Sequence, residues 1–255
     1  MRRTVSGRGR ASRRSAPFRP RGPLAPWLGW RRRPVPVFLL DLDNTLYDAN
    51  TWCFPGMHQY IHGFLMAELD LDLREAEELR ERYWRRYGTT LAGLMRHHQV
   101  DPLRFLEAIH PPGLADAVPP DPGLEDWLSH LPGPAFVFTN SLASHAARVL
   151  ERLGVGKHVA GIFDMVHSGY GGKPAPLAYR RLLRQLRVPA WRCVFFDDSR
   201  INLRPARWMG MQTVWVHPRR GWPGQGGRDR RVPALQEPSG TLYSKGWFHS
   251  GGRPW

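Results

Sequence analysis

The chain alternates short runs of consecutive apolar residues with segments of helical periodicity. Runs without polar alternation are typical of strands that are buried on both faces of a sheet. Five runs predict strands, the last of them weakly: VFLL (37–40), AFVF (135–138), CVFF (193–196), TVWV (213–216) and IFDMV (162–166). Amphipathic helical patterns lie between them, as in residues 141–154 and 176–188. This alternation predicts βαβ units and a mostly parallel α/β sheet.

One interval breaks the alternation. Nearly a hundred residues separate the first run from AFVF, and they contain helical stripes but no convincing strand. Because a structureless loop of that length is implausible, we expect an inserted α-helical subdomain over residues 50–120. The Pro/Gly-rich segment HPPGLADAVPPDPG (110–123) is interpreted as its return linker. The α/β core then comprises residues 37–49 and 121–217.

Charge is concentrated at the two ends of the chain. The formal net charge is +15, yet residues 1–36 hold eleven arginines and no acid, and residues 218–255 hold seven Lys/Arg against two acids. Residues 37–217 therefore carry a net charge of −1. The ends are rich in Gly, Pro and Arg without apolar periodicity, which predicts disordered tails. Nucleic acid is not expected to bind the core, and weak contact is expected only through the basic tails.

The sequence has no signature of a membrane or secreted protein. The N-terminus lacks an apolar h-region, and no run of 18 or more apolar residues occurs, so no spanning helix and no membrane partner are expected. Cys53 and Cys193 form neither a metal-binding spacing nor a disulfide framework. These features favour a cytoplasmic protein.

Polar clusters follow three of the predicted strands, in DLDNT, TNS and DDS. In open parallel sheets, ligands bind beyond the carboxyl ends of the strands, so these side chains should converge. Asp41 and Asp43 are expected on one side of the chain, as at positions i and i+2 of a strand. Four carboxylates in one cleft require a cation, and oxygen ligands favour Mg²⁺. The converging residues are Asp41, Asp43, Thr139, Asn140, Asp197 and Asp198.

The motifs DLDNT, FTNS, GGKPAP and FFDDS, in this order, resemble the four motifs of the haloacid dehalogenase (HAD) superfamily of phosphohydrolases. The helical insertion after the first motif resembles the C1 cap of that superfamily. The segment RYWRRYGTTLAGLMRHHQVDPLRFLEAIH is similar to the pyrimidine 5′-nucleotidase branch. The resemblance covers residues 37–217 and implies a Rossmann-like, HAD-like core with an inserted helical cap.

The resemblance also implies roles for individual residues. Asp41 would be the nucleophile and Asp43 the general acid and base. Thr139 and Asn140 would hold the phosphoryl oxygens, and Lys173 would offset negative charge on Asp41 and the phosphoryl group.

Other positions would hold the metal or select the substrate. Asp197 and Asp198 would bind Mg²⁺ together with Asp41 and the main-chain carbonyl of Asp43. Ser199 and Asn202 would support these ligands. Three residues are candidates for substrate specificity: Tyr47, Asp48 and His98.

These features together predict a Mg²⁺-dependent phosphomonoesterase that works through an aspartyl-phosphate. The expected partner is a small phosphate monoester, best matched by a nucleoside 5′-monophosphate and in particular a pyrimidine one. Two alternatives stay open. One is a broad-range phosphatase of sugar phosphates or small organic phosphates. The other, from a different class, is a protein that binds RNA or acidic surfaces through its basic tails.

Overall fold

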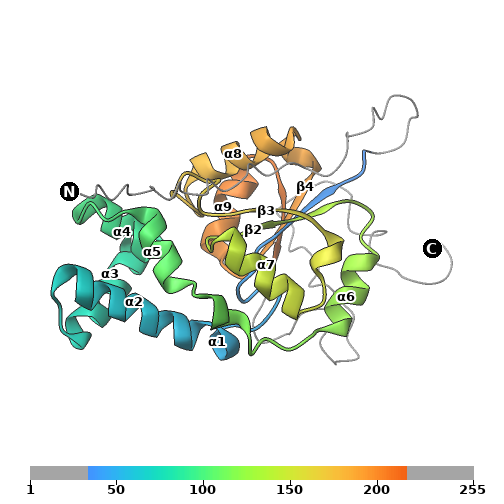
Figure 1. Cartoon of the computed structure of the whole chain (residues 1–255). Helices are drawn as coiled ribbons and strands as arrows, with labels where there is room; N and C mark the ends of the chain where they lie inside the picture. Colours follow the sequence, from blue (N-terminus) through green and yellow to red (C-terminus); the bar gives the residue numbers. More distant parts are fainter. Residues whose placement is uncertain (1–33, 217–255) are drawn as a thin grey trace, which may run out of the picture.

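A computed structural model describes residues 34–216 (Figure 1). All strands are parallel and form one five-stranded sheet in the order β3-β2-β1-β4-β5. The strands are β1 (Val37–Leu40), β2 (Ala135–Phe138), β3 (Val159–Phe163), β4 (Cys193–Asp197) and β5 (Gln212–Trp215). The predicted α/β class with a parallel sheet is confirmed.

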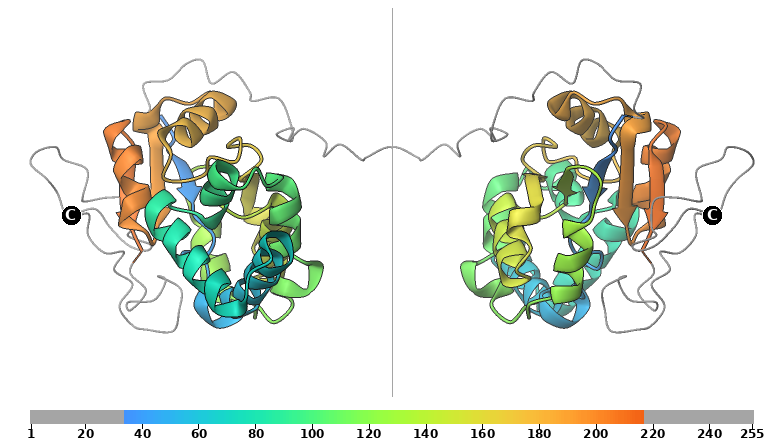
Figure 2. Two further views of the ribbon diagram at one scale, coloured as in Figure 1. Left: turned by 90° about the vertical axis from the view of Figure 1, so that its left-hand side faces the viewer. Right: turned by 90° about the vertical axis from the view of Figure 1, so that its right-hand side faces the viewer.

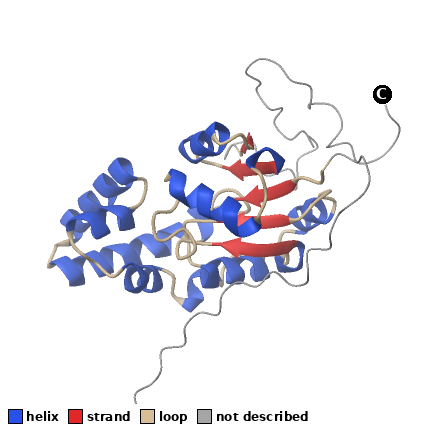
Figure 3. Ribbon diagram, turned by 90° about the horizontal axis from the view of Figure 1, so that it is seen from above, coloured by secondary structure: helices blue, strands red, loops and turns tan. Residues whose placement is uncertain are grey.

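Helices cover both faces of the sheet and also form a separate group between β1 and β2 (Figure 3). The first five helices make up this insertion, which extends away from the sheet on the left of Figure 1. They are α1 (Ala49–Trp52), α2 (Phe54–Leu69), α3 (Leu73–Tyr87), α4 (Thr90–His97) and α5 (Pro102–Ile109). The remaining helices are α6 (Pro122–Ser129), α7 (Ala143–Arg152), α8 (Pro176–Leu186) and α9 (Arg200–Trp208), with 3₁₀ turns η1 (Pro112–Ala115), η2 (Gly156–His158) and η3 (Ala190–Arg192).

The central strand β1 is buried on both faces. Phe38 and Leu40 pack into the apolar cluster that includes residues of α6 and α7. Val37 and Leu39 point the other way, into the cluster that includes residues of α8 and α9. An uninterrupted apolar run is therefore what this position requires, because alternate side chains enter two different cores.

The predicted strand boundaries hold for the stronger runs and fail for the weakest. β5 starts one residue earlier than predicted, and β4 extends one residue further to Asp197. The prediction of a strand over 162–166 is wrong, because β3 ends at Phe163. Asp164 ends it: its carboxylate accepts hydrogen bonds from the main-chain N–H groups of Ala143 and His167, which turns the chain.

Local capping explains how the insertion is divided into helices. Asp72 and Glu75 form a reciprocal capping box at the start of α3. Gly88 ends that helix with a φ of 85°, a left-handed conformation that favours glycine. The segment interpreted as a return linker is more structured than a linker. It contains η1, and it buries Leu114 and Val118.

A pair of buried histidines lies where the insertion rejoins the core. His110 follows α5 and His145 belongs to α7, and their ring centroids are 4.8 Å apart. Arg148 donates to the main-chain oxygen of His110 at 3.3 Å. Within residues 34–216, Nε2 of His110 has no hydrogen-bond partner, and neither ring nitrogen of His145 has one. We call these three residues the histidine cluster.

Two further predictions concern the ends of the chain and membranes. The tails predicted to be disordered fall mostly outside the described residues. Among the helices of residues 34–216, none combines the length and apolar character needed to cross a bilayer.

Figure 2 views the molecule from its two sides, first with the insertion in front of the sheet.

Candidate active site

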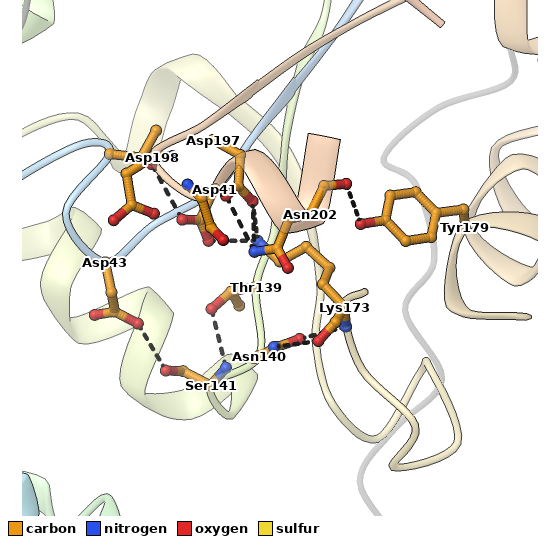
Figure 4. Close-up of polar contacts among 12 residues, drawn as sticks. Asp41, Asp43, Thr139, Asn140, Ser141, Lys173, Tyr179, Asp197, Asp198 and Asn202 are labelled. Carbon is orange, nitrogen blue, oxygen red and sulfur yellow. Dashed lines mark hydrogen bonds and ion pairs between the residues drawn. The ribbon is translucent and has the colours of Figure 1, made fainter. Parts of the chain in front are cut away.

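The carboxyl ends of three neighbouring strands carry the polar residues of the site (Figure 4). Asp41 follows β1, Thr139 follows β2, and Asp197 is the last residue of β4. Because β1 lies between β2 and β4 and all three are parallel, these residues meet at one edge of the sheet. The predicted convergence of the three strand ends is therefore present in the fold.

A buried lysine joins the two central carboxylates. Nζ of Lys173 lies 2.5 Å from Oδ1 of Asp41 and 2.8 Å from Oδ2 of Asp197. The Lys173 side chain is 1% exposed, so both pairs are shielded from solvent. We call Asp41, Lys173 and Asp197 the lysine cluster. Both carboxylates raise the pKa of Lys173 against the opposing effect of its burial, which keeps the amine charged.

Asp198 adds a third carboxylate to this edge. One oxygen from each of Asp41, Asp197 and Asp198 lies within 4.8 Å of the others. Burial and the neighbouring carboxylates raise the pKa of Asp198 to about 7, and burial raises that of Asp197 to about 6 although Lys173 opposes it. One lysine does not neutralise three carboxylates. The donor set therefore fits a hard divalent cation such as Mg²⁺, which would stabilise their ionised forms.

The carboxylate of Asp43 lies apart from this group. Its oxygens accept hydrogen bonds from the hydroxyl of Tyr47 at 2.6 Å and from that of Ser141 at 2.9 Å. Asp43 is not one of the three carboxylates grouped within 4.8 Å, but after burial its charge is among the causes that raise the pKa of Asp41. The expectation that all four carboxylates share one cleft stays a prediction. β1 ends at Leu40, so the i, i+2 rule of strands does not govern Asp41 and Asp43. That the main-chain carbonyl of Asp43 faces a metal stays a prediction.

Asn140 holds the main chain of Lys173 through both ends of its side-chain amide. Its Nδ2 donates to the carbonyl of Lys173 at 2.9 Å, and its Oδ1 accepts from the N–H of Lys173 at 2.7 Å. This contact orients the loop that carries the lysine. The Asn140 side chain is therefore engaged with protein, and a phosphoryl contact remains a prediction for its main-chain N–H alone.

The hydroxyl groups of Thr139 and Thr45 form hydrogen bonds with main-chain N–H groups and with a carboxylate of the site. Thr139 is 1% exposed and its Oγ accepts from the N–H of Ser141 at 3.0 Å. Thr45 donates to Oδ2 of Asp41 at 3.1 Å and accepts from the N–H of Asp198 at 3.0 Å. Thr45 and Ser141 were not among the predicted site residues. Their places within DLDNT and FTNS are the signal that could have identified them.

Asp197 is oriented by the start of α9. Its Oδ1 accepts from the N–H of Ser199 at 2.8 Å, and the Asn202 side chain donates to both of its oxygens, at 3.0 and 3.2 Å. Ser199 contributes its main chain here. Tyr179, another residue missed from the sequence, donates its hydroxyl to the carbonyl of Asn202 at 2.6 Å and so ties α8 to this turn.

The three candidate specificity residues have different surroundings. Tyr47 contacts Asp43 directly. Asp48 caps α1, where it accepts from the N–H and hydroxyl of Thr51, so its visible contacts are those of a helix cap. His98 is exposed at the end of α4 and pairs with the Tyr83 hydroxyl at 2.7 Å. A role for these residues in substrate selection stays a prediction.

The insertion meets the site loop at Gly88. A Cβ atom at this position would lie 2.9 Å from Cδ of Pro174, the residue after Lys173. The α3–α4 turn therefore rests against the loop that presents the lysine. This contact places residues of the insertion close to the edge of the sheet where the carboxylates gather.

Comparison with known proteins gives one family and several relatives. The family described as haloacid dehalogenase-like hydrolase matches residues 35–210. Phosphate metabolism protein 8 of Saccharomyces cerevisiae is 32% identical over 195 residues, which cover 70% of this chain and 60% of that protein. The chain thus spans less than two thirds of this relative's length.

Solved structures match this chain at lower identity. CbbY from Rhodobacter sphaeroides in complex with phosphate superposes with a TM-score of 0.51 at 20% identity, covering 79% of this chain and 92% of that one. The hydrolase YfnB from Bacillus subtilis bound to magnesium gives a TM-score of 0.48 at 17% identity, covering 72% and 89%.

Proposed function

Because the chain belongs to the haloacid dehalogenase-like hydrolases, we propose that it is a Mg²⁺-dependent phosphomonoesterase that forms an aspartyl-phosphate, a mixed anhydride, on Asp41. The observation that carries this proposal is the lysine cluster at the edge of the sheet. It holds a carboxylate against a buried ammonium at 2.5 Å, beside two further carboxylates. A nucleophile whose charge is balanced by a fixed cation can approach an anionic phosphate.

In the first step, a carboxylate oxygen of Asp41 attacks phosphorus and the bond from phosphorus to the ester oxygen breaks. That oxygen leaves with the bonding electron pair and takes a proton from Asp43. The hydroxyls of Tyr47 and Ser141 that hold Asp43 can each donate or accept a hydrogen bond. They can therefore hold this carboxyl group with or without its proton.

In the second step, Asp43 accepts a proton from a water molecule as that water attacks phosphorus. The bond between phosphorus and Asp41 breaks, which releases inorganic phosphate and restores the carboxylate. Throughout both steps, Lys173 offsets negative charge at Asp41. The Thr139 hydroxyl accepts from Ser141, so its own proton can be donated to a phosphoryl oxygen.

The metal would be held by Asp41, Asp197 and Asp198, with the main-chain carbonyl of Asp43. When bound, Mg²⁺ supplies positive charge that neutralises the carboxylates and the phosphoryl oxygens. Asn202 and the N–H of Ser199 fix the orientation of Asp197 for this purpose.

For the substrate, we propose a nucleoside 5′-monophosphate, in particular a pyrimidine one, with the insertion acting as a cap over it. Two points support this choice. The sequence from α3 to α5 resembles the pyrimidine 5′-nucleotidase branch, and the α3–α4 turn lies against the Lys173 loop. The name of the yeast relative refers to phosphate metabolism, which agrees with a phosphate ester as substrate.

Phosphate release from a panel of monoesters tests the proposal. The panel contains UMP, CMP, AMP, phosphoglycolate and sugar phosphates, with Mg²⁺ or with EDTA. We expect UMP and CMP to be hydrolysed fastest, with activity lost in EDTA and in Asp41→Asn. Equal release by wild type and Asp41→Asn would refute the mechanism. Faster hydrolysis of sugar phosphates or phosphoglycolate would leave the mechanism standing and refute the nucleotide assignment.

A further inference from the structure

The near-zero net charge of the folded part conceals a strong segregation of charge. Residues 37–164 hold ten Lys/Arg and 18 Asp/Glu, a net charge of −8. Residues 165–216 hold nine Lys/Arg and two Asp/Glu, a net charge of +7. The two acids are Asp197 and Asp198, which belong to the active site. The second half of the fold can therefore present a basic face even though the net charge of residues 37–217 is −1.

Most of this positive charge lies on two neighbouring helices. α8 and α9 cover the same face of the sheet, through buried residues such as Leu182 and Leu203 (gold and orange in Figure 1). Exposed arginines lie at positions i, i+4 and i+7 of α9 and at positions i and i+4 of α8, spacings that align side chains along one face of a helix, and a further exposed arginine caps the end of α8. The six residues are Arg180, Arg184 and Arg187 at α8, and Arg200, Arg204 and Arg207 on α9.

Within residues 34–216, none of these six arginines forms an ion pair with a carboxylate. The ion pairs found within residues 34–216 involve other side chains, such as Arg74 with Glu78 and Lys157 with Glu125. The guanidinium carbon of Arg200 lies 3.7 Å from the centre of the Trp215 ring. Six exposed guanidinium groups without counter-charges favour binding of a polyanion, and the planar guanidinium matches phosphate oxygens in two-point contacts.

Exposed tryptophans accompany the arginines. Trp208, at the end of α9, is 80% exposed, and Trp191, in the turn before β4, is 59% exposed. Both lie near the edge at which β4 and β5 begin, opposite the active-site edge. An indole held in water offers a flat face on which a nucleobase can stack. On α8 and α9 the exposed large apolar residues are Leu177, Ile201 and Trp208, which do not form the continuous apolar face of a membrane-surface helix.

We propose that the outer faces of α8 and α9 form a binding surface for single-stranded nucleic acid. The two arginine rows bind the phosphates of the strand, and Trp191 and Trp208 stack on its bases. Arginine rather than lysine at all six positions, together with exposed indoles, favours this partner over an anionic membrane. The surface begins at Arg200, beside the carboxylate edge, and extends along α9 to Trp208 at the opposite edge of the sheet. The inference rests on exposed arginines and indoles, so it does not depend on the proposed phosphatase function.

Fluorescence anisotropy with the full chain tests the surface. The probe is a fluorescein-labelled oligouridylate of about 20 nucleotides, long enough for one site. Replacing Arg184, Arg204 and Arg207 together by Ala should raise Kd by about tenfold or more and make binding less salt-dependent. The control replaces Arg74, Arg82 and Arg85 of α3 by Ala, which removes the same charge and should change Kd by less than about twofold. Both variants retain the basic tails, so the difference between them reports on α8 and α9.

A second variant separates stacking from charge. Trp208→Ala should raise Kd about fivefold or more while leaving the salt dependence unchanged, because no phosphate contact is lost. Circular dichroism should show that each variant is folded. Equal Kd values for the α8–α9 variant and the α3 control would overturn the proposal. So would binding to vesicles of about 30% phosphatidylserine in phosphatidylcholine that needs these arginines, if oligouridylate binding does not need them.

Discussion

The lysine cluster and the histidine cluster are both buried and polar, yet they satisfy their polar atoms in opposite ways. In the lysine cluster every charged group has a partner of opposite charge, with contacts of 2.5 and 2.8 Å. In the histidine cluster three ring nitrogens meet no partner within the described part of the chain. Burial lowers the pKa of both histidines to about 4, so the rings stay neutral.

This contrast separates residues arranged for chemistry from residues that only bear on stability. Paired charges at a strand edge are organised to act on a ligand, and removing one of them should affect activity or leave a charge unpaired. Neutral rings with unmet hydrogen-bonding capacity reduce stability, and replacing them with apolar groups should be tolerated.

The largest effect is expected for Asp41→Asn. Loss of the proposed nucleophile should lower phosphatase kcat by at least about 10³-fold. The free energy of unfolding should change by less than about 1 kcal/mol, because Lys173 keeps its contact with Asp197 and one repelling carboxylate is removed. Steady-state kinetics and urea unfolding measure the two quantities. His145→Leu should change the free energy of unfolding and leave activity within about twofold of wild type.

Next in size is the effect of Lys173→Met on stability. Without the ammonium, two buried carboxylates lose their counter-charge, which should cost about 3–5 kcal/mol in metal-free buffer. The matched control is Lys157→Met, because that lysine pairs with Glu125 on the surface at 2.6 Å and its side chain is 68% exposed. The control should leave the urea midpoint unchanged. An equal loss of unfolding free energy in both variants would contradict a special role for the buried ion pairs of Lys173.

The pH dependence of stability should differ between wild type and His145→Leu. The folded pKa of about 4 lies below the ordinary value of 6.5, so the unfolded chain binds more protons between these values. Protonation therefore destabilises the wild type as pH falls through this window, by up to about 3 kcal/mol for this histidine. The stability advantage of the variant should grow from pH 6.5 to about pH 4 in urea titrations.

The same window contains an opposite contribution from the active site. The raised pKa values of Asp197 and Asp198, about 6 and about 7, stabilise the metal-free fold at low pH, and this contribution is lost as pH rises through those values. Both proteins contain these carboxylates, so their contribution cancels in the difference. A difference in stability that does not vary with pH would contradict the assignment to His145.

The smallest effect is expected from two glycines of similar conformation. Gly88 and Gly154 have φ values of 85° and 78°, so Ala should cost about 1 kcal/mol at either position. A Cβ at Gly88 would press on Pro174, whereas nothing lies within 4 Å of one at Gly154. Gly88→Ala should therefore also lower kcat by about two- to fivefold, through displacement of Lys173. Equal kinetics in the two variants would show that the turn does not position the lysine.

The parts of the molecule that were predictable from sequence depend on local pattern. Buried strands give uninterrupted apolar runs, and the polar residues that follow them must meet at one edge once the strands are parallel. Asp41, Thr139 and Asp197 are therefore brought together by the backbone alone. The family membership that the motifs indicated is confirmed by the family match.

The parts that were not predictable depend on side-chain direction and long-range contact. The amide of Asn140 holds a main chain 33 positions away, and nothing in FTNS distinguishes this contact from one with phosphate. Asp43 turns to Ser141 because the strand has already ended. The net charge is a sum over the whole fold, so it does not reveal that the charged residues of α8 and α9 are all positive. His110 and His145 become neighbours only when the insertion packs on α7.

The position of β1 in the sheet has a consequence for how the protein is made. β1 pairs with β2 on one side and with β4 on the other, where Phe38 lies opposite Val194. On the ribosome, β1 emerges early, but its second neighbour is synthesised only after the insertion and most of the core. Contacts between such distant segments form slowly, and an open strand edge can associate with other chains. The nascent chain should therefore stay inactive, and need protection from aggregation, until β4 pairs with β1 and brings Asp197 beside Asp41.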